Sequence, residues 1–214
     1  MQIQAIKVSH ALMDVNSYIL AEEGSGRAVV IDPSFDVPKL LRVLADEQLY
    51  CEAILLTHGH FDHIAGVSAL KQEFGAPVYI HPADAAMLRD PAENKSLDFP
   101  GLELSPIEAD HLLRDVDRLE LAGLSVLVLA TPGHSRGSVC YLCGDYLFTG
   151  DTLFNLSIGR TDFPEGSGSQ MRESLEKLSR IEKDYIVHPG HGASSSLAFE
   201  KDNNPFLGRL KWSL

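Results

Sequence analysis

Several features that would assign this chain to a special class are missing from its sequence. Its 214 residues contain no run of about 18 apolar residues, and residues 1–7 lack the basic segment and long apolar stretch of a signal peptide. We therefore expect a cytoplasmic protein with no membrane partner. No low-complexity linker separates the halves, so a single domain over residues 1–214 is expected.

Cysteine is scarce, with three residues in the whole chain. This small, odd number fits a reducing cytoplasm better than a disulfide framework. Cys140 and Cys143 form a C-x-x-C pattern, but they lie in a predicted strand, where residues three apart point to opposite faces. We predict that they pack in the core and do not form a metal or redox pair.

Positive charge is also in short supply. The chain has 18 lysines and arginines against 30 aspartates and glutamates, which gives a formal net charge of −12. Such a field repels polyanions, so nucleic acid is not expected as a partner. Hydrophobic residues at 44% and charged residues at 22% match an ordinary globular protein and give no sign of disorder.

What the sequence does have is a dense cluster of side chains that bind metals. Residues 57–63 follow the apolar residues 53–56, which predict a buried strand, and they include His58, His60, Asp62 and His63. Imidazole and carboxylate suit zinc, iron or manganese, and the end of a rigid strand fixes their directions. An exposed polar turn is the plainer alternative, but three of the nine histidines fall in this segment. We therefore expect the chemistry here.

The periodicity of the apolar residues predicts the same order of elements in both halves. In the first half, strands are predicted at 2–8, 15–21, 27–31, 51–56 and 77–80, and helices at 37–48, 64–74 and 82–88. Residues 90–117 are expected to be mostly irregular. In the second half, strands are predicted at 118–121, 124–130, 139–142, 146–149 and 185–188, and a helix at 169–181. This order predicts two β layers faced by helices.

Three further candidates lie just beyond predicted strands of the second half: His134, Asp151 and His191. Each stands next to a glycine, which lets the backbone approach a metal closely. Side chains at strand ends converge on one edge of a sheet sandwich, so these residues are expected to meet residues 57–63. Asp32 follows a strand of the first half, and we expect it to orient a ligating histidine.

With these positions, the sequence resembles the metallo-β-lactamase superfamily over essentially its full length. The resemblance implies the α/β (α+β) class and a four-layer αββα sandwich with a dinuclear centre. It implies that His58, His60 and His134 hold one metal and that Asp62, His63 and His191 hold the other. Asp151 would bridge the two divalent ions, for which zinc is expected and iron or manganese are alternatives. Such a pair lowers the pKa of a shared water, and Asp62 is the catalytic residue expected to orient the resulting hydroxide.

A closer resemblance is to short proteins similar to glyoxalase II, which hydrolyse thioesters of glutathione. It rests on residues 149–154, 159–164 and 204–206. The resemblance implies a hydrolase of a small-molecule thioester such as S-lactoylglutathione, by attack of a hydroxide bound to metal. Glyoxalase II has a C-terminal helical domain that grips glutathione, and residues 192–214 are too few to form one, so we expect none here.

Three alternatives are weighed against this hypothesis. Residues 159–163 also resemble a persulfide dioxygenase, which binds one iron through positions equivalent to His58, His134 and Asp151. True class B β-lactamases commonly use a thiolate ligand, and no cysteine lies near His134 or Asp151, which disfavours antibiotic hydrolysis. A binding protein that has lost activity is disfavoured because all seven predicted ligands are present.

Other polar residues have weaker signals. Arg160 either binds a substrate carboxylate through its planar fork or pins its own loop through Asp162, and the sequence favours neither. Arg136, close to His134 in the chain, is a similar candidate that we expect to be more exposed to solvent. His10 and Asn16 are candidates for lining the cleft. Leu210, Trp212 and Leu214 cover either the core or a partner chain, and this too stays open.

Overall fold

The first half of the chain forms a mixed sheet in the computed structural model, which describes residues 2–207. The strands lie side by side in chain order: β1 (Ile3–His10), β2 (Val15–Glu22), β3 (Arg27–Ile31), β4 (Tyr50–Leu55), β5 (Val78–Ile80) and β6 (His111–Leu112). The pairs β1–β2 and β2–β3 are antiparallel, whereas β3, β4, β5 and β6 run parallel. The carboxyl ends of β3 and β4 therefore meet at one edge, where Asp32 and residues 57–63 begin.

The second half forms another sheet with the order β14-β13-β10-β9-β8-β7. Its strands are β7 (Arg118–Leu121), β8 (Leu124–Ala130), β9 (Val139–Cys143), β10 (Tyr146–Gly150), β13 (Ile186–Pro189) and β14 (Ser195–Ser196). The two predicted hairpins, β7–β8 and β9–β10, are both present. A small hairpin of β11 (Leu153–Phe154) and β12 (Ser157–Ile158) follows β10.

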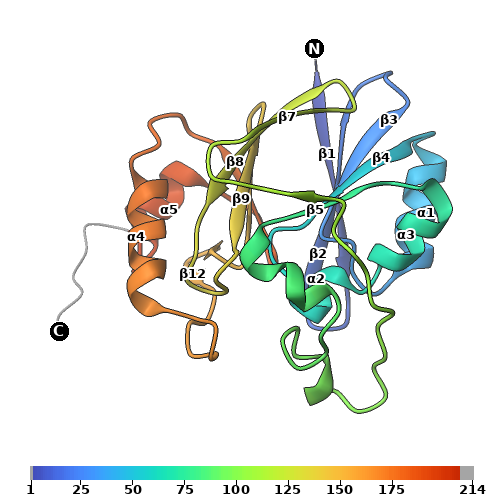
Figure 1. The fold of residues 1–214 in the computed structure, drawn as a ribbon. Coiled ribbons are helices and arrows are strands. Elements are labelled where there is room, and N and C mark those ends of the chain that lie inside the picture. The colour runs from blue at the N-terminus through green and yellow to red at the C-terminus, as the bar shows by residue number, and fades with distance from the viewer. Residues whose placement is uncertain (1, 208–214) are drawn as a thin grey trace.

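Helices cover the outer faces of both sheets and complete the predicted αββα sandwich. In Figure 1, α1 (Val37–Asp46) and α3 (Val67–Phe74) lie on one side, and α4 (Gly168–Ser179) and α5 (Leu197–Asn203) lie on the opposite side. The predicted cap of α1 is present, because the Asp36 side chain accepts a hydrogen bond from the Lys39 amide at 3.2 Å. Within residues 2–207, no helix is long and apolar enough to span a membrane.

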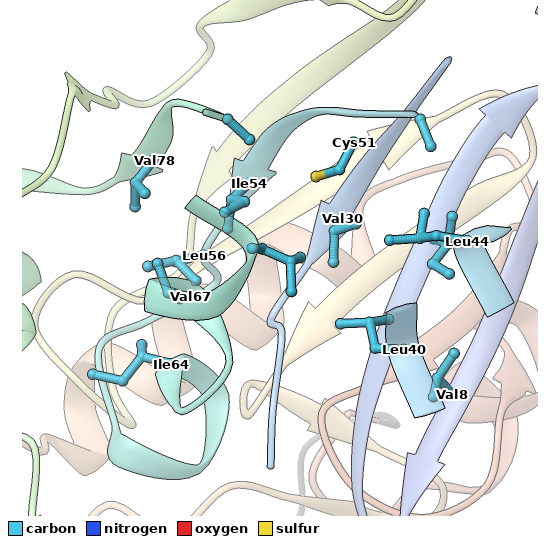
Figure 2. Packing of buried hydrophobic residues seen from close by; sticks show 14 of the residues in the cluster. Val8, Val30, Leu40, Leu44, Cys51, Ile54, Leu56, Ile64, Val67 and Val78 are labelled. Carbon is cyan, nitrogen blue, oxygen red and sulfur yellow. The ribbon is translucent and has the colours of Figure 1, made fainter. Parts of the chain in front are cut away.

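Buried apolar side chains join these four layers. Figure 2 shows the outer cluster of the first sheet, where Leu40 and Leu44 of α1 and Val67 of α3 pack against the strands. A middle cluster between the sheets contains Tyr141 and Phe148, and a third cluster lies between the second sheet and helices α4 and α5. Full burial of such a side chain stabilises the fold by roughly 1.5–3 kcal/mol.

The cysteines confirm the core interpretation. Cys140 belongs to the cluster under α4 and α5, whereas Cys143 belongs to the middle cluster, so the two side chains point to opposite faces of β9. Cys51 lies in the cluster under α1 and α3. All three thiols are buried and free.

Several predicted boundaries were wrong. The helix predicted at 64–74 is two helices, α2 (Phe61–Ile64) and α3, separated at Gly66. The Gly66 amide donates to the Pro33 carbonyl at 2.8 Å, and a Cβ at this position would lie 2.7 Å from the Ser34 carbonyl oxygen. The segment expected at 82–88 is the 3₁₀ helix η1 (Pro82–Leu88). The short elements η2 (Ser96–Asp98), β6, β11, β12 and β14 and the helix α5 were not predicted. Leu210, Trp212 and Leu214 lie outside the described residues.

Candidate metal centre

The seven predicted ligands meet at the edge where strands of both sheets end. Six of their side chains are buried, and that of His191 is 23% exposed. The first half supplies four of them after β4 and in α2: His58, His60, Asp62 and His63. The loops after β8, β10 and β13 supply His134, Asp151 and His191. The convergence expected from strand ends is therefore present in the fold.

The first group of candidate ligands consists of three imidazoles. Suitable ring nitrogens of His58, His60 and His134 all lie within 4.8 Å of one another. Burial, together with the charges of neighbouring histidines, lowers the pKa of His58, and burial is also the main cause that lowers the pKa of His60 and His134. The three rings are therefore neutral near pH 7, which is the form in which imidazole binds a metal.

The second group contains a carboxylate as well as two imidazoles. Ligand atoms of Asp62, His63 and His191 also lie within 4.8 Å of one another. Burial alone would lower the pKa of His63, but the carboxylates of Asp62 and Asp151 outweigh it and raise that pKa well above its ordinary value. Hydrogen bonds with the same two carboxylates overcome burial and raise the pKa of His191 to about 10. This concentration of negative charge favours a cation.

Asp151 lies between the two groups. Its Oδ2 is 3.4 Å from Nε2 of His134, its Oδ1 is 3.4 Å from Nε2 of His63, and its Oδ2 is 3.5 Å from Nε2 of His191. The backbone behind it is tightly packed, because a Cβ at Gly190 would lie 2.2 Å from Oδ1 of Asp151 and 2.7 Å from Cε1 of His63. A glycine is therefore required at position 190 for the carboxylate to reach both groups.

Two buried atoms test whether this cluster fits metal ions. Among the described residues, Nε2 of His58 and Oδ1 of Asp151 are buried without a hydrogen-bond partner. Buried polar atoms are rarely left unpaired in folded proteins, and both of these belong to types that bind divalent ions. The donor set of imidazole nitrogens and carboxylate oxygens fits zinc, iron or manganese.

Asp32 contacts the second group from outside. Its Oδ2 is 3.0 Å from Nδ1 of His63, and it also accepts a hydrogen bond from the Thr57 hydroxyl at 2.6 Å. Its Oδ1 accepts from the Thr57 amide at 2.7 Å. Asp32 has a positive φ of 49°, so the turn after β3 aims its side chain back toward β4. With Nδ1 of His63 facing Asp32, Nε2 of the same ring faces Asp151.

Two further carboxylates had no recognisable signal in the sequence. Glu165, on the loop before α4, lies 3.0 Å from Nε2 of His60. Asp84 of η1 accepts hydrogen bonds from the Ser135 hydroxyl and the Gly137 amide, both at 2.6 Å, and from the Gly59 amide at 3.3 Å. Burial is the main cause that raises the pKa of Asp84. Asp84 ties the loop that carries His134 to the loop between His58 and His60.

A cavity of about 500 Å³ opens onto the candidate metal centre. Several aromatic and apolar side chains line it, together with five of the metal-binding candidates on its floor and a few charged groups. Its lining residues are Met13, His60, Phe61, Asp62, Lys95, Asp98, Phe99, His134, Asp151, Phe154, Arg160, Phe163 and His191. The cavity is large enough for a small organic substrate and has mainly apolar walls.

The arginine candidates differ in position. Arg160 lines the cavity, but its guanidinium makes a bidentate pair with Asp162 at 2.7 and 2.8 Å and lies 4.2 Å from the ring centroid of Phe163. Of the two alternatives for Arg160, the structure therefore contains the second, in which Arg160 pins its own loop through Asp162. Arg136 is exposed and is not among the described residues that line the cavity.

His10 and Asn16 do not line the cavity within the described part of the chain. His10 is buried, with Nε2 2.9 Å from the Ser17 hydroxyl. The Asn16 side chain donates to the carbonyls of Pro189 and Gly192, both at 3.0 Å, and so supports the loop that carries His191. Asn16 therefore contributes to the candidate centre indirectly, by holding the loop that carries His191.

The short β11–β12 hairpin forms one wall of the cavity through Phe154. Asn204 holds this hairpin by donating to the carbonyls of Phe154 and Ser157 at 3.3 and 3.0 Å. Asn204 also donates to Glu200 at 2.8 Å, and Glu200 accepts from the Leu156 amide at 2.9 Å. The stretch 204–206, noted in the sequence for its resemblance, thus fixes a wall of the cavity.

The αββα sandwich, with histidines and aspartates that could hold metal ions clustered at one edge, is typical of metal-dependent enzymes of one fold. The sequence profile of the metallo-beta-lactamase superfamily matches residues 11–191, and the chain belongs to this family.

Among known relatives, a hydroxyacylglutathione hydrolase of Photobacterium profundum is 35% identical over 201 residues, which cover 92% of this chain and 71% of that protein. A probable metallo-hydrolase of Bacillus subtilis, YqgX, is 34% identical over 198 residues, which cover 91% of this chain and 93% of that protein. Family membership and these relatives indicate a metallohydrolase.

Solved structures share the whole fold. A structure described as the B3 metallo-beta-lactamase BLEG-1 has a TM-score of 0.90 at 38% identity and covers 95% of this chain and 99% of its own. TTHA1623 in a di-iron-bound form has a TM-score of 0.83 at 35% identity and covers 94% and 100%. ETHE1 from Myxococcus xanthus has a TM-score of 0.76 at 31% identity and covers 94% and 83%.

Proposed function

We propose that the protein is a metal-dependent thioester hydrolase that acts on S-acylglutathiones such as S-lactoylglutathione. The observation that carries this proposal is the presence of two ligand groups around one shared carboxylate, Asp151. A dioxygenase with a single iron has no need of the second group, Asp62, His63 and His191. The completeness of that group meets the requirement of a hydrolase that uses two metal ions.

The residues of the site have separate roles in this proposal. His58, His60 and His134 would hold one ion, Asp62, His63 and His191 the other, and Asp151 both. When bound, the ions would supply a water of lowered pKa and a Lewis acid that polarises the thioester carbonyl. Asp62 lines the cavity floor, and its carboxylate can accept a hydrogen bond from the attacking water and so orient it.

The cavity supports a small thioester as substrate. Phe61, Phe99, Phe154 and Phe163 line it and limit the access of bulk water to the reacting carbonyl. The relative from Photobacterium profundum is named a hydroxyacylglutathione hydrolase, which supports glutathione as the thiol. Arg160 remains our candidate for contact with a substrate carboxylate, which would have to compete with Asp162. The outward position of Arg136 makes it the weaker candidate.

Zinc is the metal we propose, with iron as the main alternative because TTHA1623 is described in a di-iron-bound form. The ligand set contains only nitrogen and oxygen donors and so does not distinguish these ions. We place the protein in the cytoplasm, and its three free, buried thiols support a reducing compartment.

Metal analysis combined with two assays tests this function. The purified protein should contain about two divalent ions per chain and should hydrolyse S-lactoylglutathione with release of glutathione. Oxygen uptake with glutathione persulfide, together with about one iron per chain, would support the dioxygenase and overturn the proposal. Removal of the ions with a chelator should abolish hydrolysis, and added zinc should restore it.

β-Lactam hydrolysis is the second candidate function. The structure described as a B3 metallo-beta-lactamase is 38% identical to this chain over nearly its full length. This likeness outweighs the missing cysteine ligand, on which we disfavoured antibiotic hydrolysis from the sequence. A chromogenic cephalosporin, assayed beside S-lactoylglutathione on the same preparation, compares the two activities directly. A higher kcat/KM for the cephalosporin would make the β-lactamase function the better assignment.

A further inference from the structure

The two ring nitrogens of His60 face different groups. Nδ1 lies 2.8 Å from Nε2 of His134, on the side where the first ligand group gathers. Nε2 lies 3.0 Å from Oε1 of Glu165, on the opposite side of the ring. A neutral imidazole carries one proton, so a ring that binds a metal through Nδ1 must carry its proton on Nε2.

Glu165 is well built to accept that proton in a hydrogen bond. The residue is 8% exposed, and its second oxygen, Oε2, lies 2.9 Å from Nζ of Lys95. Lys95 is itself largely covered, with 16% of its side chain exposed. The two oxygens of Glu165 therefore have different partners, one from the candidate metal centre and one from the loop before η2.

The loop that carries Glu165 is held in a tight turn. The Gly166 amide donates to the Phe163 carbonyl at 2.8 Å, and a Cβ at Gly166 would lie 2.6 Å from the Thr161 carbonyl oxygen. Phe163 packs edge-on against His60, with ring centroids 5.3 Å apart. The turn and this aromatic contact keep Glu165 against His60.

We propose that Glu165 is a positioning residue for the first ligand group. It accepts a hydrogen bond from Nε2–H of His60 and so keeps the lone pair of Nδ1 directed toward the metal, while Lys95 holds the carboxylate in place. The inference rests on the proposed metal centre. Partners of this kind typically change metal affinity or activity by roughly 10- to 100-fold.

A simpler interpretation is that Glu165 and Lys95 only pin two loops together. The two interpretations differ in what each partner contributes. If the ion pair is only a pin, removing either partner has the same effect on stability, and neither removal changes metal affinity. If Glu165 positions His60, its loss weakens metal binding far more than the loss of Lys95, because Lys95 does not contact the imidazole.

Zinc affinity, measured by competition with a chromophoric chelator, separates these interpretations. Glu165→Leu should weaken one zinc affinity by roughly 10- to 100-fold. Glu165→Gln should weaken it less, because the amide oxygen still accepts a hydrogen bond from His60. Lys95→Met should have a smaller effect than Glu165→Leu. Glu173→Gln, on the exposed face of α4, is the matched control and should bind zinc as the wild type does.

A spectroscopic measurement completes the test. The ¹⁵N shifts of the His60 ring in metal-free protein should report a proton on Nε2 in the wild type and a loss of this preference in Glu165→Leu. Should Glu165→Leu fail to fold, Glu165→Gln and the wild-type ring shifts still decide the question. Equal zinc affinities in wild type and Glu165→Leu, or a wild-type proton on Nδ1, would overturn the inference alone. A wild type that binds no metal would overturn the proposed function as well.

Discussion

The two candidate ligand groups share Asp151 but differ in charge. The first group, His58, His60 and His134, consists of imidazoles whose pKa values are lowered mainly by burial. The second group adds the carboxylate of Asp62 and contains His63, whose pKa is raised by neighbouring carboxylates. The comparison teaches that one ion would be bound by three neutral imidazoles and the shared Asp151, whereas the other would be bound where a second carboxylate adds to the negative charge.

The two groups share one feature, which is a carboxylate that contacts a histidine from outside the group. In each, a carboxylate outside the group contacts the ring nitrogen that faces away from the other ligands: Glu165 contacts His60, and Asp32 contacts His63. Each of these two groups combines two residues of 58–63 with a residue from a loop that follows a strand of the second sheet. Each group therefore depends on the docking of the two sheets, and each can be disturbed separately.

The largest effect is expected from Asp151→Ala, because this side chain approaches both groups. We expect a loss of more than roughly 100-fold in kcat, which exceeds the usual cost of losing an outer partner. Bound metal, measured by elemental analysis, should fall at both positions. If the variant keeps the wild-type metal content and turnover, the shared role of Asp151 is wrong.

A selective effect is expected from Gly190→Ala. The added Cβ would lie 2.2 Å from Oδ1 of Asp151 and 2.7 Å from Cε1 of His63, so it should displace the second group more than the first. Metal content should fall from about two ions per chain to about one. Gly168→Ala is the control, since its Cβ would meet only the Thr161 hydroxyl at 3.7 Å. Loss of both ions from Gly190→Ala would show that the groups cannot be separated.

Asp32→Asn probes the outer partner of the second group. The amide can still accept one hydrogen bond, but the charge next to His63 and Thr57 is lost. We expect zinc affinity at one position to fall by roughly 10- to 100-fold, with a loss of about 1–3 kcal/mol in the free energy of unfolding. Chelator competition and urea unfolding measure the two effects, and Asp46→Asn at the exposed end of α1 is the control.

The candidate ligands and the four layers were predictable from the sequence, because each depends on residues that are close together in the chain. Residues 57–63 are contiguous, and His134, Asp151 and His191 each stand next to a glycine at the end of a predicted strand. The four layers followed from the periodicity of the apolar residues. The profile match and the similar structures confirm this fold.

The outer contacts were not predictable, because they join residues that are far apart in the chain. Glu165 is separated from His60 by 105 positions, and Asp84 is separated from Gly137 by 53. A glutamate in a polar loop has the same local pattern whether it faces solvent or a histidine. The break between α2 and α3 was missed for a similar reason, since it depends on how closely Gly66 approaches the chain at Pro33.

His188 tests whether a lowered pKa by itself marks a ligand. It lies in β13 below the His191 loop and packs against Tyr18, with ring centroids 4.9 Å apart. Burial, with a smaller contribution from Lys7, lowers its pKa from 6.5 to about 4. Between these values the unfolded chain binds more protons than the folded one, so the free energy of unfolding falls as the pH is lowered from 6.5 toward 4.

His188→Gln should remove this part of the pH dependence, which is on the order of 1–3 kcal/mol. Urea unfolding of wild type and variant at pH 7 and at pH 4 measures the difference, with the exposed His111→Gln as control. Metal content should stay unchanged, because His188 belongs to neither ligand group. A loss of metal in His188→Gln would mean that the two groups do not account for the whole centre.

The smallest effect on metal content and kcat is expected outside both groups, at Asn204. Asn204→Ala removes the donor to Phe154, Ser157 and Glu200, and it leaves the fully buried Glu200 with a poorer set of partners. We expect a loss of about 1–3 kcal/mol in the free energy of unfolding. Because Phe154 lines the cavity and both ligand groups stay intact, KM should rise while kcat and metal content change little. Asn203→Ala, one residue earlier and exposed, should leave KM unchanged. A fall in kcat with constant KM would instead mean that the β11–β12 hairpin acts on the metal centre itself.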